Sequence, residues 1–280
     1  MQKVDYPFIS PIWLKRNLNN PKILIADCRW SLTDRDYGLQ SYMSSHIPDA
    51  FFLSVDSDLA GEVVNHGGRH PLPDVKKFEK KMNSIGLTQE KTVICYDNDY
   101  VGASRLWWLL TFFGHTKVKI LNGGYKGWTE HGFPVSKVIP KEQEGSFKAV
   151  PSNDIIIDHS TIKNFAGKFV IVDSRQPERC RGEFEPIDKK AGHIPGAINI
   201  PYSNAISSDG NFKTVKELKK IYDGVGRDVV VYCGSGVTAC VNFLGIYSVG
   251  IKPKLYAGSW SDWVSYQDNP VETASEDTKF

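Results

Sequence analysis

The chain contains an internal repeat, and this feature constrains its fold more than any other. Four segments of the first half recur in the same order in the second half. They are ILIADCR at 23–29 and VIVDSR at 170–175, HIPDA at 46–50 and HIPGA at 193–197, VICY at 93–96 and VVVY at 229–232, and GGYKGW at 123–128 and GSWSDW at 258–263. Four matches in one order predict a duplicated domain.

Each copy has the pattern of an α/β unit. Short β-branched runs such as VVVY alternate with segments of helical period at 104–113 and 239–249. This alternation is typical of a mainly parallel sheet flanked by helices. We therefore expect two tandem α/β domains, with an exposed polar linker and a frayed polar tail. The expected boundaries are 1–138 for the first domain, 139–153 for the linker, 154–270 for the second domain and 271–280 for the tail.

Composition and charge exclude several classes of protein. A formal net charge of +2 over 280 residues gives no electrostatic reason to expect nucleic acid or an acidic membrane as a partner. No apolar run approaches the ~18 residues of a membrane span, and the N-terminus lacks a signal-peptide core, so we expect a soluble, cytoplasmic protein. The five cysteines form no CxxC pair and no Cys/His cluster, which predicts reduced thiols, no metal site and no cofactor.

The segment CGSGVT at 233–238 carries the strongest chemical signal. It lies between a predicted strand and a predicted helix, and Gly234 and Gly236 allow its N–H groups to point inward beside the positive helix end. Such a loop favours the thiolate of Cys233 and would hold the charge of a persulfide anion. We expect Cys233 to be the nucleophile and Gly234, Gly236, Val237 and Thr238 to bind the substrate. The other cysteines lack comparable surroundings and are expected to be unreactive.

CGSGVTA at 233–239 resembles the active-site loop of 3-mercaptopyruvate sulfurtransferases, members of the tandem-rhodanese family. Thiosulfate-preferring members carry two basic residues where Gly234 and Ser235 stand. The resemblance extends over residues 5–270 and includes Asp173, Arg175, HIPGA at 193–197 and GSW at 258–260. It implies two rhodanese-like domains that pass sulfane sulfur from a small anionic donor, 3-mercaptopyruvate, through a Cys233 persulfide. The acceptor would be a thiol, thioredoxin or cyanide.

The first copy is expected to be catalytically silent. Alignment of the two copies places DNDYVGA at 97–103 against the active loop, so that Asp97 stands where Cys233 stands in the second copy. A carboxylate cannot accept sulfane sulfur, and we therefore expect this domain to be scaffold and cleft wall. His46 and His193 belong to the repeated motif of both copies, which favours a structural role.

An anionic donor needs fixed positive charge. The resemblance places a substrate-binding arginine at Arg179, with Arg181 as the neighbouring alternative. The family's second substrate arginine follows a Glu-Pro pair, but here Ile187 follows that pair. We therefore expect the carboxylate of mercaptopyruvate to be held less tightly, with a raised KM.

GRHPLP at 68–73 resembles the first-domain segment that reaches the cleft in 3-mercaptopyruvate sulfurtransferases. In that family a histidine and an upstream aspartate are proposed to assist a serine of the loop. The corresponding residues here are His70, Asp56 and Ser235. A histidine within hydrogen-bond reach of a hydroxyl can move a proton, but its position must come from the fold.

Other functions remain open from the sequence. A thiosulfate sulfurtransferase or a persulfide carrier would use the same Cys233 chemistry, and a non-catalytic interaction module could use the same fold. A cysteine-based phosphatase would need an arginine six positions after the nucleophile, and Ala239 occupies that position.

Overall fold

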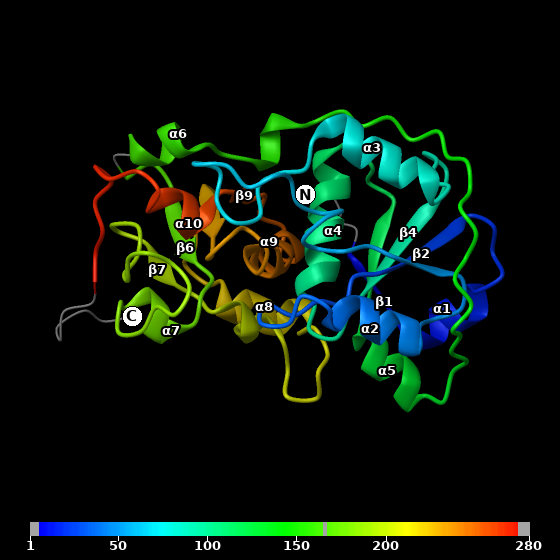
Figure 1. Cartoon of the computed structure of the whole chain (residues 1–280). Coiled ribbons are helices and arrows are strands. Elements are labelled where there is room, and N and C mark those ends of the chain that lie inside the picture. The colour runs from blue at the N-terminus through cyan, green and yellow to red at the C-terminus, as the bar shows by residue number, and fades with distance from the viewer. Residues whose placement is uncertain (1–5, 165–166, 274–280) are drawn as a thin grey trace.

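The computed structural model contains two α/β domains and describes residues 6–164 and 167–273. Each domain has one parallel sheet with helices packed against it (Figure 1). The duplicated α/β architecture predicted from the repeat is confirmed.

The first domain has a five-stranded sheet in the order β1-β5-β4-β2-β3. Its strands are β1 (Phe8–Ile9), β2 (Ile23–Asp27), β3 (Ala50–Phe52), β4 (Thr92–Tyr96) and β5 (Val118–Leu121). Its helices are α1 (Pro11–Asn17), α2 (Tyr37–Ser44), α3 (Val75–Ser84), α4 (Val101–Phe112) and α5 (Gly124–Glu130). The central strands β2 and β4 are apolar almost throughout because helices cover both faces of a parallel sheet.

The second domain has a four-stranded sheet in the order β7-β6-β8-β9. Its strands are β6 (Val170–Asp173), β7 (Ile198–Asn199), β8 (Val229–Tyr232) and β9 (Lys254–Leu255). Its helices are α6 (His159–Lys163), α7 (Pro177–Cys180), α8 (Val215–Ile221), α9 (Ala239–Ser248) and α10 (Ser259–Trp263), with the 3-10 turns η1 (Asn153–Ile155) and η2 (Tyr202–Ala205). All residues of β8 are buried, so this strand is a rigid base for the loop that follows it.

The repeated Asp and Arg residues form the same buried ion pair in both domains. Arg29 lies 2.6 Å from Asp27, and Arg175 lies 2.6 Å from Asp173. Tyr232 donates its hydroxyl to Asp173 from the next strand, as Tyr96 does to Asp27. These pairs tie the carboxyl ends of neighbouring strands together, which explains why the motif is present in both copies.

The histidines of the repeat are also buried. The ring of His46 lies 2.8 Å from the carbonyl of Tyr42, and that of His193 lies 2.7 Å from the carbonyl of Cys180. Both contacts are to backbone, and they agree with the structural role expected for these two residues.

Helices α4 and α9 join the two domains. They lie side by side between the two sheets (Figure 1), and Trp107 and Trp108 of α4 pack against Phe243 of α9. One buried apolar cluster includes residues of both domains. Because the loop at 233–238 joins β8 to α9, this packing holds the loop against the first domain.

The linker is only partly exposed. Residues 139–152 contain no helix or strand, and Ile139 and Val150 are exposed as expected. The expectation is wrong for Phe147, which is fully buried beside Phe78 and donates its N–H to Asn83 Oδ1 at 2.7 Å. Burial of an aromatic side chain of this size is favourable compared with leaving it in water. Phe147 therefore anchors the linker to the first domain.

Of the predicted tail, residues 274–280 lie outside the described residues. The expected fraying does not hold for Glu272, which exchanges backbone hydrogen bonds of 2.8 and 3.0 Å with His193. In the described part of the chain, no helix has the length and apolar character that crossing a membrane requires.

Candidate active site

Cys233 follows β8 directly and its side chain is buried. Its Sγ accepts the N–H of Gly236 at 3.2 Å. Its own N–H donates to Ser259 Oγ at 3.0 Å, and its carbonyl accepts the N–H of Trp260 at 2.9 Å. The first turn of α10 therefore fixes the backbone of the loop, and the sulfur is left facing a backbone donor.

Position 236 requires glycine for two reasons. Its φ is +77°, in the left-handed region, and a Cβ there would lie 2.1 Å from the carbonyl oxygen of Ala257. This conformation turns the N–H of Gly236 toward Cys233. On the other side, the carbonyl of Gly236 accepts Nη1 of Arg105 at 3.1 Å.

Ser235, His70 and Asp56 form a hydrogen-bonded chain across the two domains. Nδ1 of His70 lies 2.8 Å from Oγ of Ser235, and Nε2 lies 2.9 Å from Oδ1 of Asp56. Trp30 Nε1 donates to the other carboxylate oxygen of Asp56 at 3.0 Å. The hydrogen bond from His70 is the main cause that lowers the pKa of Asp56, so this carboxylate stays ionised beside the imidazole.

Both domains line a cleft of about 480 Å³ in front of Cys233. The lining includes Trp30, Tyr37, Arg69 and Asp99 from the first domain and Arg179, Gly234, Ser235, Val237 and Thr238 from the second. The structure therefore brings most of the predicted site residues to one cavity. Gly236 reaches the site through its N–H, and His70 and Asp56 lie behind Ser235.

Arg179 lies at the cleft, as expected. Its Nη2 lies 2.7 Å from Oε1 of Glu185 and 3.2 Å from Oδ2 of Asp188. The alternative candidate, Arg181, is wrong as a cleft residue, because its guanidinium is turned outward and pairs with exposed Glu183 at 2.6 Å. Residues two positions apart in a helical turn point about 200° apart, so only one of the two arginines can face the cleft.

Two arginines of the first domain were not among the predicted site residues. Arg69 lines the cleft beside Arg179. Arg105 of α4 is fully buried, and its Nη2 donates to the carbonyl of His70 while its Nη1 holds Gly236. In the sequence, Arg105 could have been recognised as a lone charged residue in an apolar helical segment. Arg69 could have been recognised as the neighbour of His70.

Asp97 occupies the loop of the first domain that corresponds to the active loop. Its carboxylate accepts the N–H of Tyr100 at 2.7 Å and that of Ala103 at 2.9 Å. Burial raises the pKa of Asp97 well above its usual range. The side chain of Asp97 is thus the acceptor for backbone N–H groups of this loop. In an active copy, the corresponding N–H groups would face a bound anion.

The remaining four cysteines are buried, and burial raises the pKa of each thiol. For Cys240 the pKa rises to about 12, so its thiolate is scarce near neutral pH. Among the described residues, no group of three or more His, Cys, Asp or Glu side chains could hold a metal ion.

The sequence model of the rhodanese-like domain matches residues 10–131 and 159–266, once in each half of the chain. The chain belongs to the rhodanese-like family. A Pseudomonas aeruginosa relative, provisionally named 3-mercaptopyruvate sulfurtransferase, is 38% identical over 272 residues, which are 93% of this chain and 95% of the relative. A Mycobacterium tuberculosis relative, provisionally named thiosulfate sulfurtransferase, is 35% identical over 257 residues, 89% of this chain and 90% of the relative.

A solved structure of this rhodanese family supports the same assignment. The crystal structure of the 3-mercaptopyruvate sulfurtransferase SseA from Escherichia coli has a TM-score of 0.82 and 32% identity, and the match covers 92% of this chain and all of that one. The predicted family, the two rhodanese domains and the sulfurtransferase class are therefore confirmed.

Proposed function

We propose that this rhodanese-family protein moves sulfane sulfur from 3-mercaptopyruvate to a thiol or to cyanide through a persulfide on Cys233. The observation that carries the choice of donor is the chain of Ser235, His70 and Asp56 beside the nucleophile. Mercaptopyruvate releases the enolate of pyruvate, which needs a proton. These three hydrogen-bonded residues lie where a proton can be delivered.

In the first half-reaction, the Cys233 thiolate attacks the sulfur of mercaptopyruvate. The new S–S bond forms as the donor's C–S bond breaks, and the electron pair of that bond stays on carbon as the enolate of pyruvate. The transferred sulfur loses its proton to become the persulfide anion, and the enolate carbon gains one proton to give pyruvate. The N–H of Gly236, which already faces Sγ, can stabilise the charge on the loop.

The proton chain acts best with His70 protonated. Nε2–H then donates to Asp56 and Nδ1–H donates to Ser235, which leaves the Ser235 hydroxyl free to donate to the carbonyl oxygen of the donor. The ionised carboxylate of Asp56 accepts the hydrogen bond from Nε2–H and orients the ring. Ser235 thereby stabilises the developing enolate.

In the second half-reaction, an acceptor attacks the outer sulfur of the persulfide. The S–S bond breaks, its electron pair returns to Cys233 as thiolate, and the acceptor leaves as a persulfide or as thiocyanate. A small thiol, thioredoxin and cyanide all fit this chemistry as acceptors. We propose the cytoplasm as the compartment of the reaction. In this proposal Asp97 marks the first domain as catalytically silent.

Thiosulfate is the second candidate donor. Three arginines line the cleft, and the guanidinium of one of them, Arg175, is paired with Asp173 and Glu185. The other two, Arg69 and Arg179, would suit a dianion. The relative from Mycobacterium tuberculosis, provisionally named as a thiosulfate enzyme, is nearly as similar as the one named for mercaptopyruvate. Thiosulfate releases sulfite with the electron pair of the broken S–S bond, so this donor has no use for the proton chain.

Steady-state kinetics with the two donors side by side, at one acceptor concentration, test the proposal. We expect a higher kcat/KM with 3-mercaptopyruvate. A higher kcat/KM with thiosulfate would reverse the assignment of the donor.

A further inference from the structure

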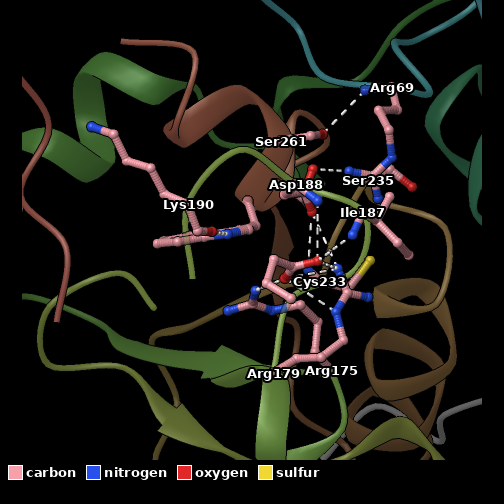
Figure 2. Close-up of polar contacts among 12 residues, drawn as sticks. Arg69, Arg175, Arg179, Ile187, Asp188, Lys190, Cys233, Ser235 and Ser261 are labelled. Carbon is pink, nitrogen blue, oxygen red and sulfur yellow. Dashed lines mark hydrogen bonds and ion pairs between the residues drawn. The ribbon is translucent and has the colours of Figure 1, made fainter. Parts of the chain in front are cut away.

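Arg105 of α4 is fully buried and contacts the loop at 233–238 without lining the cleft. The arginines that do line the cleft pair with carboxylates (Figure 2); they are Arg69, Arg175 and Arg179. In the described part of the chain, the guanidinium of Arg105 has no carboxylate partner and donates to backbone carbonyls instead.

Stability alone does not account for this side chain. A buried cation without an opposite charge costs free energy. Burial lowers the pKa of Arg105, yet a guanidinium stays ionised near neutral pH. The question is therefore what its hydrogen bonds hold in place.

The guanidinium of Arg105 joins the loop to the segment that carries His70. Nη1 donates to the carbonyl of Gly236 at 3.1 Å, and Nη2 donates to the carbonyl of His70 at 3.1 Å. Nε donates to the carbonyl of Leu59 at 3.3 Å, which fixes the plane of the group. Because a guanidinium is planar and its donors have a fixed spacing, Arg105 sets the separation between the two segments.

These two segments carry groups that act in the proposed reaction. The N–H of Gly236 faces Sγ of Cys233 at 3.2 Å, and the neighbouring Ser235 Oγ lies 2.8 Å from Nδ1 of His70. A contact of about 3.6 Å is no longer a hydrogen bond, so a relative shift of about 1 Å would separate Ser235 from His70. The proton chain thus depends on the separation that Arg105 sets.

Other contacts of the loop are weaker or lie elsewhere. Sγ of Cys240 also donates to the carbonyl of Gly236, at 3.3 Å, but a thiol is a weak donor and Cys240 belongs to the same domain as the loop. The backbone N–H of Arg69 donates to Ser261 across the domains, but this contact is to α10. Hydrogen bonds from a guanidinium are charge-assisted and about twice as strong as neutral ones.

We propose that Arg105 is a positioning residue for sulfur transfer, which holds the backbones of Gly236 and His70 at the separation at which His70 reaches Ser235. This inference rests on the proposed transfer from 3-mercaptopyruvate and deepens it. A buried side chain of the first domain, outside the cleft, then controls proton delivery across the domain interface.

Arg105→Lys tests the positioning role. It keeps the positive charge but has one nitrogen atom, which cannot hold both carbonyls as a planar fork does. A misplaced His70 should lower kcat/KM for 3-mercaptopyruvate by about 10- to 100-fold. Thiosulfate does not need the proton chain, and any effect through Gly236 is common to both donors. The ratio of kcat/KM for mercaptopyruvate to that for thiosulfate should therefore fall about tenfold or more; an unchanged ratio would overturn the inference.

Trp107→Phe is the matched control on the same helix. Trp107 is buried and packs against Phe243 and Tyr247 of α9, so its replacement disturbs the domain interface and leaves the hydrogen bonds of Arg105 in place. The control should keep the wild-type donor ratio. An equal fall of the ratio in both variants would assign the effect to loosened packing and overturn the inference. If thermal unfolding shows that Arg105→Lys does not fold, Arg105→Gln replaces it, because it keeps an N–H donor.

A double-mutant cycle with Ser235→Ala tests whether Arg105 acts through the proton chain. Ser235→Ala already removes the hydroxyl that His70 reaches. Adding Arg105→Lys should then leave the donor ratio at the value of Ser235→Ala alone, because the two residues act as a unit. A further fall of about tenfold in the double variant would show that Arg105 acts by another route, contrary to the inference.

Hydrogen exchange gives a readout that needs no turnover. The amides of residues 233–238 and of Arg69 and His70 should exchange faster in Arg105→Lys than in wild type or Trp107→Phe. Equal exchange in all three proteins would contradict the inference. Wild-type protein incubated with donor alone is weighed in parallel: if it gains no sulfur with either donor, the proposed function fails. If it gains sulfur while Arg105→Lys changes neither the ratio nor the exchange, only the inference fails.

Discussion

Replacement of Ser235 by alanine should separate the two donors. The hydroxyl is buried, adjoins the nucleophile and lies 2.8 Å from Nδ1 of His70. Removing it interrupts proton delivery to the enolate of pyruvate but takes nothing from the release of sulfite. General acid–base catalysis contributes about 100-fold or more, so kcat/KM for 3-mercaptopyruvate should fall by about 100-fold. That loss corresponds to about 2.7 kcal/mol of transition-state stabilisation.

The assay measures kcat/KM of wild-type and Ser235→Ala protein with both donors at one acceptor concentration. Thiosulfate is the internal control, because its turnover needs the same Cys233 loop without the proton chain. We expect its kcat/KM to change little. An equal loss with both donors would show that Ser235 merely supports the loop, and no loss with mercaptopyruvate would refute its role as proton donor.

Three further predictions concern other residues. Asp97→Ala should lower the unfolding temperature, because two buried N–H groups lose their acceptor, yet leave sulfur transfer nearly unchanged; a hundredfold loss of transfer in folded protein would contradict a silent first domain. Cys240→Ser should retain activity, since burial raises the pKa of this thiol to about 12, and a large loss would give it a redox role. The hydrogen bond from His70 lowers the pKa of Asp56, so the wild-type protein should unfold at a higher temperature than Asp56→Asn above about pH 4. This difference in unfolding temperature should disappear as the pH falls further, and calorimetry can test it.

The sequence was sufficient to predict the elements that depend on local pattern. The order of the repeated segments predicted two domains, and the two glycines around Ser235 predicted a loop that points N–H groups at Cys233. The first expectation relies on the order of the repeats, and the second on short-range chemistry, because the left-handed φ of Gly236 is one that only glycine adopts readily.

Contacts between the domains could not be predicted in this way. Arg69 and Asp188 are 119 positions apart, and they meet because the two domains pack together through α4 and α9 and through hydrogen bonds such as that from Arg69 N–H to Ser261 Oγ. The choice between Arg179 and Arg181 likewise depended on the direction of a short helical turn. The burial of Phe147 was likewise not predicted, because it depends on contacts with Phe78 and Asn83 of α3.

The central claim is that Cys233 carries the transferred sulfur, and intact-mass measurement tests it most directly. Wild-type protein incubated with 3-mercaptopyruvate alone should gain the mass of one sulfur atom and lose it again when an acceptor thiol is added. Cys233→Ser should gain none and should not turn over. A Cys233→Ser protein that still acquires the sulfur and still turns over would contradict the account.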